Sequence, residues 1–435
     1  MSATSGAPAV PAGAVGQYAA VTAAYWGFTL TDGALRMLVL LHFHQLGYSP
    51  IELAFLFLLY EAMGVITNAF GGWLGSRHGL RLTLFLGLAT QVVALVALSW
   101  TDPAWTMALS VAWVMGCQAL SGIAKDLTKM SSKSAVKTVV PEGGAGSENR
   151  LFKWVALLTG SKNALKGVGF FLGGALLTGL GFQGALWAMA GALALVLLGA
   201  VAVVRADLGR AKSKPKGAAL FSQNRSVNLL AAARLFLFAS RDVWFVVGLP
   251  LFLATAFGWG FDAVGGFMAL WIIGYGMVQA SAPKLLRKTR DQAAGGAAAL
   301  VWVLALLVCM TVLAALCTGQ LPNPAMLMGG LILFGVLFAV NSAVHSWLVV
   351  SLADSDKVAL TVGFYYMANA WGRLLGTLLS GLLYQWGLGF GATEAAGDHG
   401  VSPDGLAFVL WGSVGLLVLA SGFTVALKQH LRADG

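Results

Sequence analysis

The chain has 435 residues, of which 58% are hydrophobic and only 10% are charged, and its formal net charge is +10. Runs of about twenty apolar residues recur along it, each long enough to cross ~30 Å of hydrocarbon, which excludes a soluble protein and predicts an all-α polytopic membrane protein. The basic residues are scattered between these runs without any nucleic-acid reading motif, so no nucleic-acid partner is expected. Cys117, Cys309 and Cys317 stand apart in apolar segments, so no metal site, disulfide or cofactor is expected either.

Apolar runs and the polar breaks between them predict twelve transmembrane helices. They begin near residues 18, 50, 80, 104, 151, 183, 227, 262, 293, 324, 358 and 404. The basic, proline-containing stretch 205–226 divides them into an N-terminal bundle (1–204) and a C-terminal bundle (227–435) of six helices each. Leu46-Gly47-Tyr48 opens the second helix much as Trp259-Gly260-Phe261 opens the eighth, which indicates a duplicated six-helix unit.

Lysine and arginine are confined to alternate loops. If the N-terminus is cytoplasmic, every basic loop lies inside, whereas the outer loops contain acids such as Asp102 and Asp262 but no lysine or arginine. The positive-inside rule therefore predicts that both termini lie in the cytoplasm. The first basic residue is Arg36, so the N-terminal stretch lacks the charged start of a secretory signal and is expected to be retained.

The loop between the second and third helices reads GGWLGSRHGLR. It resembles the signature loop of the major facilitator superfamily at five positions, which are Gly72, Leu74, Arg77, Gly79 and Arg81. The resemblance implies the superfamily fold and a gating role for Gly72, Arg77, Gly79 and Arg81. Ser76 replaces the usual acid, so the salt-bridge part of that role is not expected.

Charged residues inside membrane helices are costly and normally face a cavity or a partner. The third, sixth, ninth and twelfth helices have none in their cores and are expected to face lipid. The other helices supply the following polar groups: Asp32, Arg36, Glu61, Lys162, Lys166, Arg234, Arg241, Asp242, His345 and Arg373. Glycine-rich runs in the fifth helix, and Gly372 with Gly376 in the eleventh, predict close helix packing.

Six of these core residues are cations and three are acids, which leaves about three positive charges uncompensated and predicts a site for a polyanion. The expected substrate-binding residues are Arg36, Lys162, Lys166, Arg241 and Arg373, with Asn163 between the two lysines and Lys125 at the cavity mouth. The expected charge-balancing or proton-coupling residues are Asp32, Glu61, Asp242 and His345.

Structural roles for the same residues remain open alternatives. Lys162 and Lys166 can pair with Asp32, Glu61 or Asp126 and lock the two halves together. Asp32 and Arg36 have the i, i+4 spacing of an intrahelical ion pair. His345, one turn after Asn341, is expected to be a hydrogen-bonded packing residue or a proton relay.

Three further stretches point to a narrower family. They are TDGALRMLVLLHFHQLGYSP at 31–50, ALSGIAKDLTKMSSKSAVK at 119–137 and LTGSKNALKGVGFFLGG at 158–174. They resemble the organoarsenical efflux permeases of bacterial arsenic-resistance operons, the ArsJ type. The resemblance implies a location in the bacterial inner membrane. That resemblance implies export of 1-arseno-3-phosphoglycerate, made when glyceraldehyde-3-phosphate dehydrogenase, the expected functional partner, uses arsenate in place of phosphate.

Three other functions are alternatives to organoarsenical export: an exchanger of organic phosphates, a membrane enzyme, and a receptor or scaffold. An organophosphate or sugar-phosphate exchanger would use the same cations. A membrane enzyme would need a nucleophile with its base or a metal cluster, and His42 and His44 have no Asp/His set at ligand spacing. A receptor or scaffold would bind without flux, but the longest polar loops, about twenty residues, form no soluble domain. A secondary transporter is therefore expected rather than an enzyme.

Overall fold

The computed structural model describes residues 14–67, 80–139, 147–204, 224–285, 291–352, 358–394 and 404–433, and these are helical almost throughout. In the N-terminal half the helices are α1 (Ala14–Gln45), α2 (Pro50–Leu56), α4 (Leu80–Leu98), α5 (Met107–Val139) and α6 (Ser147–Val203). In the C-terminal half they are α7 (Arg225–Phe245), α8 (Gly248–Thr255), α9 (Phe261–Leu285), α10 (Gln292–Cys317), α11 (Pro324–Ser351), α12 (Val358–Glu394) and α13 (Asp404–Ala433). A further helical stretch, 58–67, continues α2 after a break at Phe57.

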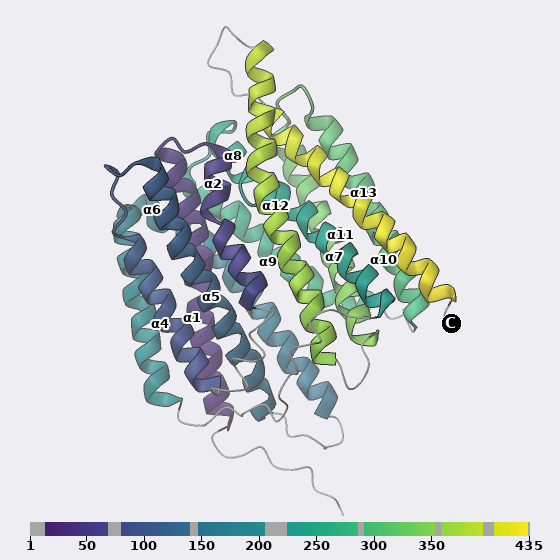
Figure 1. Ribbon diagram of the computed structural model, residues 1–435, viewed down its shortest axis with the longest axis horizontal. Helices are drawn as coiled ribbons and strands as arrows, with labels where there is room; N and C mark the ends of the chain where they lie inside the picture. The colour runs from purple at the N-terminus through teal and green to yellow at the C-terminus, as the bar shows by residue number, and fades with distance from the viewer. Residues whose placement is uncertain are drawn as a thin grey trace, which may run out of the picture.

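Nine segments of the described chain are long and apolar enough to cross a membrane. One of them, Ser161–Val203, crosses twice, because the chain turns back at Gly181 (φ 67°, ψ −178°), a left-handed backbone that favours glycine. Ser161 and Val196, on either side of this turn, both lie beside the same level of α1, near Trp26 and Gly27. With α1 and α12 added, the predicted twelve-helix fold in two six-helix halves is confirmed (Figure 1).

The predicted helix boundaries differ from the structure in two places. The fifth and sixth helices are joined through Gly181 with no intervening loop. The seventh helix begins at Arg225, inside the stretch expected as the central loop, because the Asn224 side chain caps its first turn by accepting from the backbone N–H groups of Ser226 and Val227. Residues 205–223 of that loop lie outside the described part of the chain.

The seventh crossing is interrupted between α7 and α8. At Val247 the backbone leaves the helical region (φ −123°, ψ −53°). The Ser380 hydroxyl on α12 accepts hydrogen bonds from the freed N–H groups of Val247 (3.2 Å) and Gly248 (3.1 Å). A membrane helix tolerates such a break only when its polar groups are satisfied in this way. The break therefore ties α7 to α12 just beyond the charged residues Arg241 and Asp242.

Two ends of the bundle serve as landmarks. The Gly181 end carries the turns at 46–49, Gly181 and 256–260, and the Asn224 end carries the start of α7 and the end of α13. The helices without core charges, α4, the part of α6 after Gly181, α10 and α13, expose large apolar side chains such as Val93, Leu195, Val301 and Val418. These four helices thus have the exposed apolar faces that the sequence predicts for contact with lipid.

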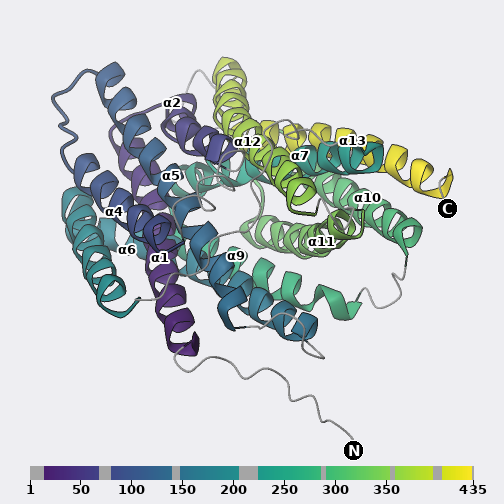
Figure 2. The same cartoon turned by 60° about the horizontal axis from the view of Figure 1, so that its bottom comes forward.

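Among the described residues, the most extensive contacts between the two halves are those of α6 with α9 and of α2 with α12. Both views of the chain show α2 lying beside α12 (Figures 1 and 2). The Ile51 N–H donates to Gln385 Oε1 at 3.1 Å, and the backbone of Pro50 touches Gly381. A Cβ placed on Gly265 of α9 would lie 2.8 Å from the Phe170 carbonyl oxygen of α6. These contacts run from the middle of the bundle to its Gly181 end.

Candidate functional site

Glycines position the charged residues by allowing helix backbones to touch. A Cβ on Gly33 of α1 would lie 2.6 Å from the carbonyl oxygen of Lys166 on α6. On the other side, a Cβ on Gly376 of α12 would lie 2.8 Å from the carbonyl oxygen of Ala239 on α7. The close packing predicted from the glycine-rich runs is confirmed. It places Lys166 beside α1 and Arg373, one turn before Gly376, beside α7.

Glu61 joins the two halves of the protein at the middle of the bundle. Its Oε1 atom lies 2.5 Å from Arg36 Nη2 and 2.6 Å from Arg373 Nη2. The Glu61 side chain is 1% exposed, and Arg36 packs over the rings of Phe57 and Tyr60. One buried carboxylate oxygen therefore accepts charge-assisted hydrogen bonds from a guanidinium group of each half.

Asp242 continues this network on the C-terminal side. Its Oδ1 atom lies 2.5 Å from Arg241 Nη2, and its Oδ2 atom lies 3.5 Å from Arg373 Nε. Arg241 also lies over the rings of Phe238 and Phe338. Arg373 is thus the central cation, because it contacts the acid of each half.

Asp32 forms a separate branch of the network with Lys166 and Tyr60. Lys166 Nζ lies 3.8 Å from Asp32 Oδ2, while the Tyr60 hydroxyl donates a 2.5 Å hydrogen bond to Asp32 Oδ1. Lys125 Nζ lies 3.9 Å from the centroid of the Tyr60 ring. Tyr60 therefore touches both an acid and a cation of the site.

Cations outnumber acids in this described cluster. The cations are Arg36, Lys125, Lys166, Arg234, Arg241 and Arg373, and the acids are Asp32, Glu61 and Asp242. Among the described residues, no carboxylate lies within 4 Å of Lys125 or Arg234, so these two carry charge without an ion-pair partner. A buried surplus of three positive charges favours the binding of an anion with several negative charges.

The remaining expected site residues fall around this cluster. Lys162 lies half-buried on α6, one turn before Lys166. The Asn163 side chain lies beside Gly276 at the contact between α6 and α9, where a glycine Cβ would be 3.1 Å from Asn163 Cβ. Arg81 lies in the first turn of α4 at the Asn224 end, over the ring of Phe85.

The other residues of the expected gating loop, Gly72, Arg77 and Gly79, lie outside the described residues.

Two of the pairings left open by the sequence are not formed. Asp32 and Arg36 do not pair along α1, because Asp32 contacts Lys166 and Tyr60 whereas Arg36 contacts Glu61. His345 makes no hydrogen bond to Asn341, and within the described part of the chain neither side chain has a hydrogen-bond partner, although both are at least 99% buried. In each case the neighbouring helices, rather than the spacing along one helix, determine which groups meet.

Sequence reasoning missed Tyr60 as a site residue. Its position directly before Glu61 in an apolar run was the one available signal, but adjacent residues of a helix do not share a face, so no spacing pattern pointed to it.

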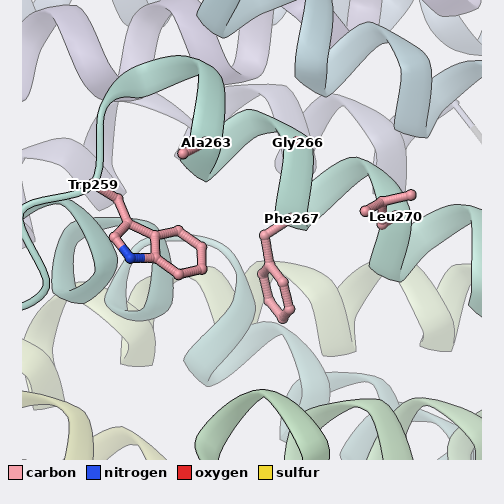
Figure 3. A pocket seen from close by; sticks show the side chains of 5 residues that line it. All are labelled: Trp259, Ala263, Gly266, Phe267 and Leu270. Atoms are coloured by element: carbon pink, nitrogen blue, oxygen red, sulfur yellow. The ribbon is translucent and has the colours of Figure 1, made fainter. Parts of the chain in front are cut away.

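A hollow of a different kind lies on the surface near the start of α9. It is lined by Trp259, Ala263, Gly266, Phe267 and Leu270 (Figure 3). Its lining is almost entirely apolar, so it offers nothing to neutralise an anion. Unlike the charged cluster, it has no charged side chain in its lining, and its apolar surface suits contact with lipid acyl chains.

Two six-helix halves that meet around a buried charged centre define the protein as a membrane transporter. The family model for the Major Facilitator Superfamily matches residues 18–377, and the chain belongs to this superfamily. A crystal structure of the nucleoside transporter NupG has the same fold, with a TM-score of 0.64 over 96% of this chain and 99% of that one. The two sequences are 14% identical, so the likeness concerns the fold alone. A search of curated protein sequences gave no match.

Proposed function

We propose that this transporter exports a small organic polyanion, 1-arseno-3-phosphoglycerate, from the bacterial cytoplasm and so confers resistance to arsenate. The observation that carries the proposal is the surplus of buried cations at the junction of the two halves. The proposed substrate has a phosphate at one end and a pentavalent arsenate ester at the other. Both are oxyanions, which guanidinium and ammonium groups bind well.

The resemblance of three segments to organoarsenical efflux permeases narrows the substrate from polyanions in general to the arsenate ester. Glyceraldehyde-3-phosphate dehydrogenase would supply that ester from arsenate. Trivalent arsenic would instead prefer thiolates, and Cys117, Cys309 and Cys317 are dispersed. The pentavalent form therefore agrees better with the residues of the site.

In the proposed mechanism the Asn224 end faces the cytoplasm of the inner membrane and both termini lie inside. Contacts at the Gly181 end would keep the outer side shut while substrate enters between the halves. The incoming oxyanions compete with Glu61 and Asp242 for Arg36, Arg241 and Arg373. Rocking of the halves then exposes the anion to the outside. Asp32, which pairs with one cation among the described residues, is the proposed proton-coupling acid.

Arsenic accumulation in arsenate-challenged, arsenic-sensitive cells tests this proposal. Cells would express the protein with and without the dehydrogenase, alongside the double variant Lys162→Ala, Lys166→Ala and the control Lys428→Ala on α13. We expect cellular arsenic to fall only when the dehydrogenase is present, and this effect to disappear in the double variant but not in the control.

Two outcomes contradict the proposal in different ways. A fall in arsenic without the dehydrogenase would make free oxyanion the substrate. No effect under either condition, with the protein present in the membrane, would overturn the arsenate ester and favour organophosphate exchange.

A further inference from the structure

Arg234 is a buried cation with a set of neutral partners. It lies on α7 seven residues before Arg241 and is 4% exposed. Its Nε donates to Asn369 Oδ1 at 3.1 Å, and its Nη1 donates to the Ser342 hydroxyl at 3.0 Å and to the Ser342 carbonyl at 3.3 Å. A guanidinium group left without a counter-ion in a buried site is costly unless an anion binds there.

Hydrogen-bond donors from two other helices gather around the same point. The Gln279 amide lies 3.3 Å, and the Tyr275 hydroxyl 3.5 Å, from the Ser342 hydroxyl, so α9 and α11 both contribute. No acid of the described chain is within 4 Å of Arg234. The cluster therefore has one fixed positive charge, whose partners are the neutral oxygens of Asn369 and Ser342, with Gln279 and Tyr275 as further donors beside it. A bound oxyanion would replace these neutral acceptors and accept from the same donors.

Unsatisfied polar groups adjoin this cluster. Asn341 and His345, which flank Ser342 on α11, are 0% and 1% exposed, and none of their side-chain nitrogen and oxygen atoms has a hydrogen-bond partner among the described residues. Buried polar groups without partners are rare because each costs free energy. Here they point to a ligand that supplies the missing contacts.

The Arg234 cluster lies close to the central network. The guanidinium carbon of Arg234 is 3.9 Å, and that of Arg241 4.9 Å, from the centroid of the same Phe238 ring. The two guanidinium groups are thus no farther apart than the sum of these distances, which a short carbon chain with an oxyanion at each end can span. Arg241 belongs to the network with acids, whereas Arg234 does not.

We propose that Arg234, Ser342 and Gln279, with Tyr275 and His345, form a second oxyanion subsite that binds one end of a two-ended anion while the central network binds the other. The subsite makes the transporter selective for compact molecules with two oxyanion groups over those with one. This inference rests on the proposed function, since it concerns how an organic anion is recognised, but it depends on no arsenic chemistry.

Binding to the purified full-length protein in lipid nanodiscs tests the subsite. The probes are 3-phosphoglycerate, with two oxyanion groups, and glycerol 3-phosphate, with one, each titrated by calorimetry. The variants are Arg234→Gln, Arg234→Lys and, as a matched control on the same helix, Arg225→Gln, whose side chain is exposed in the first turn of α7. Melting temperatures without ligand report whether each variant is folded.

We expect the unaltered protein to prefer 3-phosphoglycerate, and Arg234→Gln to weaken its binding roughly ten- to hundredfold, the value of one charge-assisted hydrogen-bonding group. Glycerol 3-phosphate binding should remain nearly unchanged, since its phosphate occupies the central network. Arg234→Lys keeps the positive charge but loses the paired donors of the guanidinium group, so its affinity for 3-phosphoglycerate should lie between those of the unaltered protein and Arg234→Gln. Arg225→Gln should match the unaltered protein.

If Arg234→Gln still binds 3-phosphoglycerate more tightly than glycerol 3-phosphate by the same factor, the subsite is refuted but the proposed function is not. Binding of neither probe by the unaltered protein would overturn both. If Arg234→Gln does not fold, Arg234→Lys and Ser342→Ala test the subsite instead. Both keep a positive charge at position 234, so they disturb folding less. Full preference for 3-phosphoglycerate in these two variants would overturn the subsite, and reduced preference would support it.

Discussion

Of the substitutions considered, Glu61→Gln should most strongly shift the equilibrium between joined and separated halves. The change keeps the shape of the side chain but removes the charge that both Arg36 and Arg373 contact at 2.5 and 2.6 Å. Removing one partner of a buried ion pair costs about 3–5 kcal/mol, because the other charge stays buried without compensation. Arg373 retains Asp242, so we expect the lower end of that range.

A cost of ~3 kcal/mol corresponds to a shift of about two decades in the equilibrium between joined and separated halves. Arg373→Gln should cost less, although it removes the same contact between the halves. The reason is that it leaves Glu61 paired with Arg36, and Asp242 paired with Arg241. The order of effects, Glu61→Gln greater than Arg373→Gln, follows directly from the geometry.

Cross-linking at the Gly181 end measures this equilibrium. Cysteines at positions 51 and 385, where the Ile51 N–H contacts Gln385, would be joined by a short bifunctional thiol reagent in a chain whose native Cys117, Cys309 and Cys317 are replaced. The control is Asp291→Asn, another acid-to-amide change, at a helix N-cap where asparagine serves equally well.

We expect cross-linking to fall strongly in Glu61→Gln, less in Arg373→Gln and not in the control. Equal yields in Glu61→Gln and the control would refute the idea that Glu61 joins the halves.

Two further predictions concern neighbouring parts of the site. Gly265→Ala should reduce the same cross-link, because its Cβ would lie 2.8 Å from the Phe170 carbonyl oxygen across the junction and overpacking costs about 1–3 kcal/mol. Gly266→Ala, whose nearest neighbour would be 3.8 Å away, should leave the yield unchanged, and equal loss in both would rule out the steric explanation. Asp32→Asn should abolish the pH dependence of transport measured in proteoliposomes, whereas persistence of that dependence would exclude Asp32 as the coupling acid.

Much of the fold follows from the sequence because membrane insertion leaves few alternatives. A run of about twenty apolar residues has to cross as a helix, since the bilayer offers its backbone no other hydrogen-bond partner. The helices with exposed apolar faces were predictable for a related reason. A helix without charged residues in its core has no group that must be shielded from the hydrocarbon, so it can lie at the outside of the bundle. The glycine contacts of Gly376 with Ala239 and of Gly33 with Lys166 follow from the need for close packing.

The partners within the site were not predictable in the same way. Spacing along α1 favoured an Asp32–Arg36 pair, but the ion pairs depend on how α1 is rotated toward α6 and toward the 58–67 stretch. Periodicity gives the face of one helix and says little about which face of another helix meets it. The same reasoning applies to the missing His345–Asn341 contact, because a spacing of one turn along α11 does not by itself bring two side chains into hydrogen-bonding geometry.

The three acids of the cluster suit an anion transporter because they occupy its cations when no substrate is bound. Without a partner, each buried cation would cost several kcal/mol. The acids provide these partners in the following pairs: Asp32 with Lys166, Glu61 with Arg36 and Arg373, and Asp242 with Arg241. On the proposed function, an oxyanion that takes Arg373 from Glu61 also removes a bond between the halves. Substrate binding and opening of the junction are then coupled, and by linkage a looser junction must bind the anion more tightly. Glu61→Gln should therefore weaken the junction and strengthen anion binding together, whereas a purely structural Glu61 would change the first without the second.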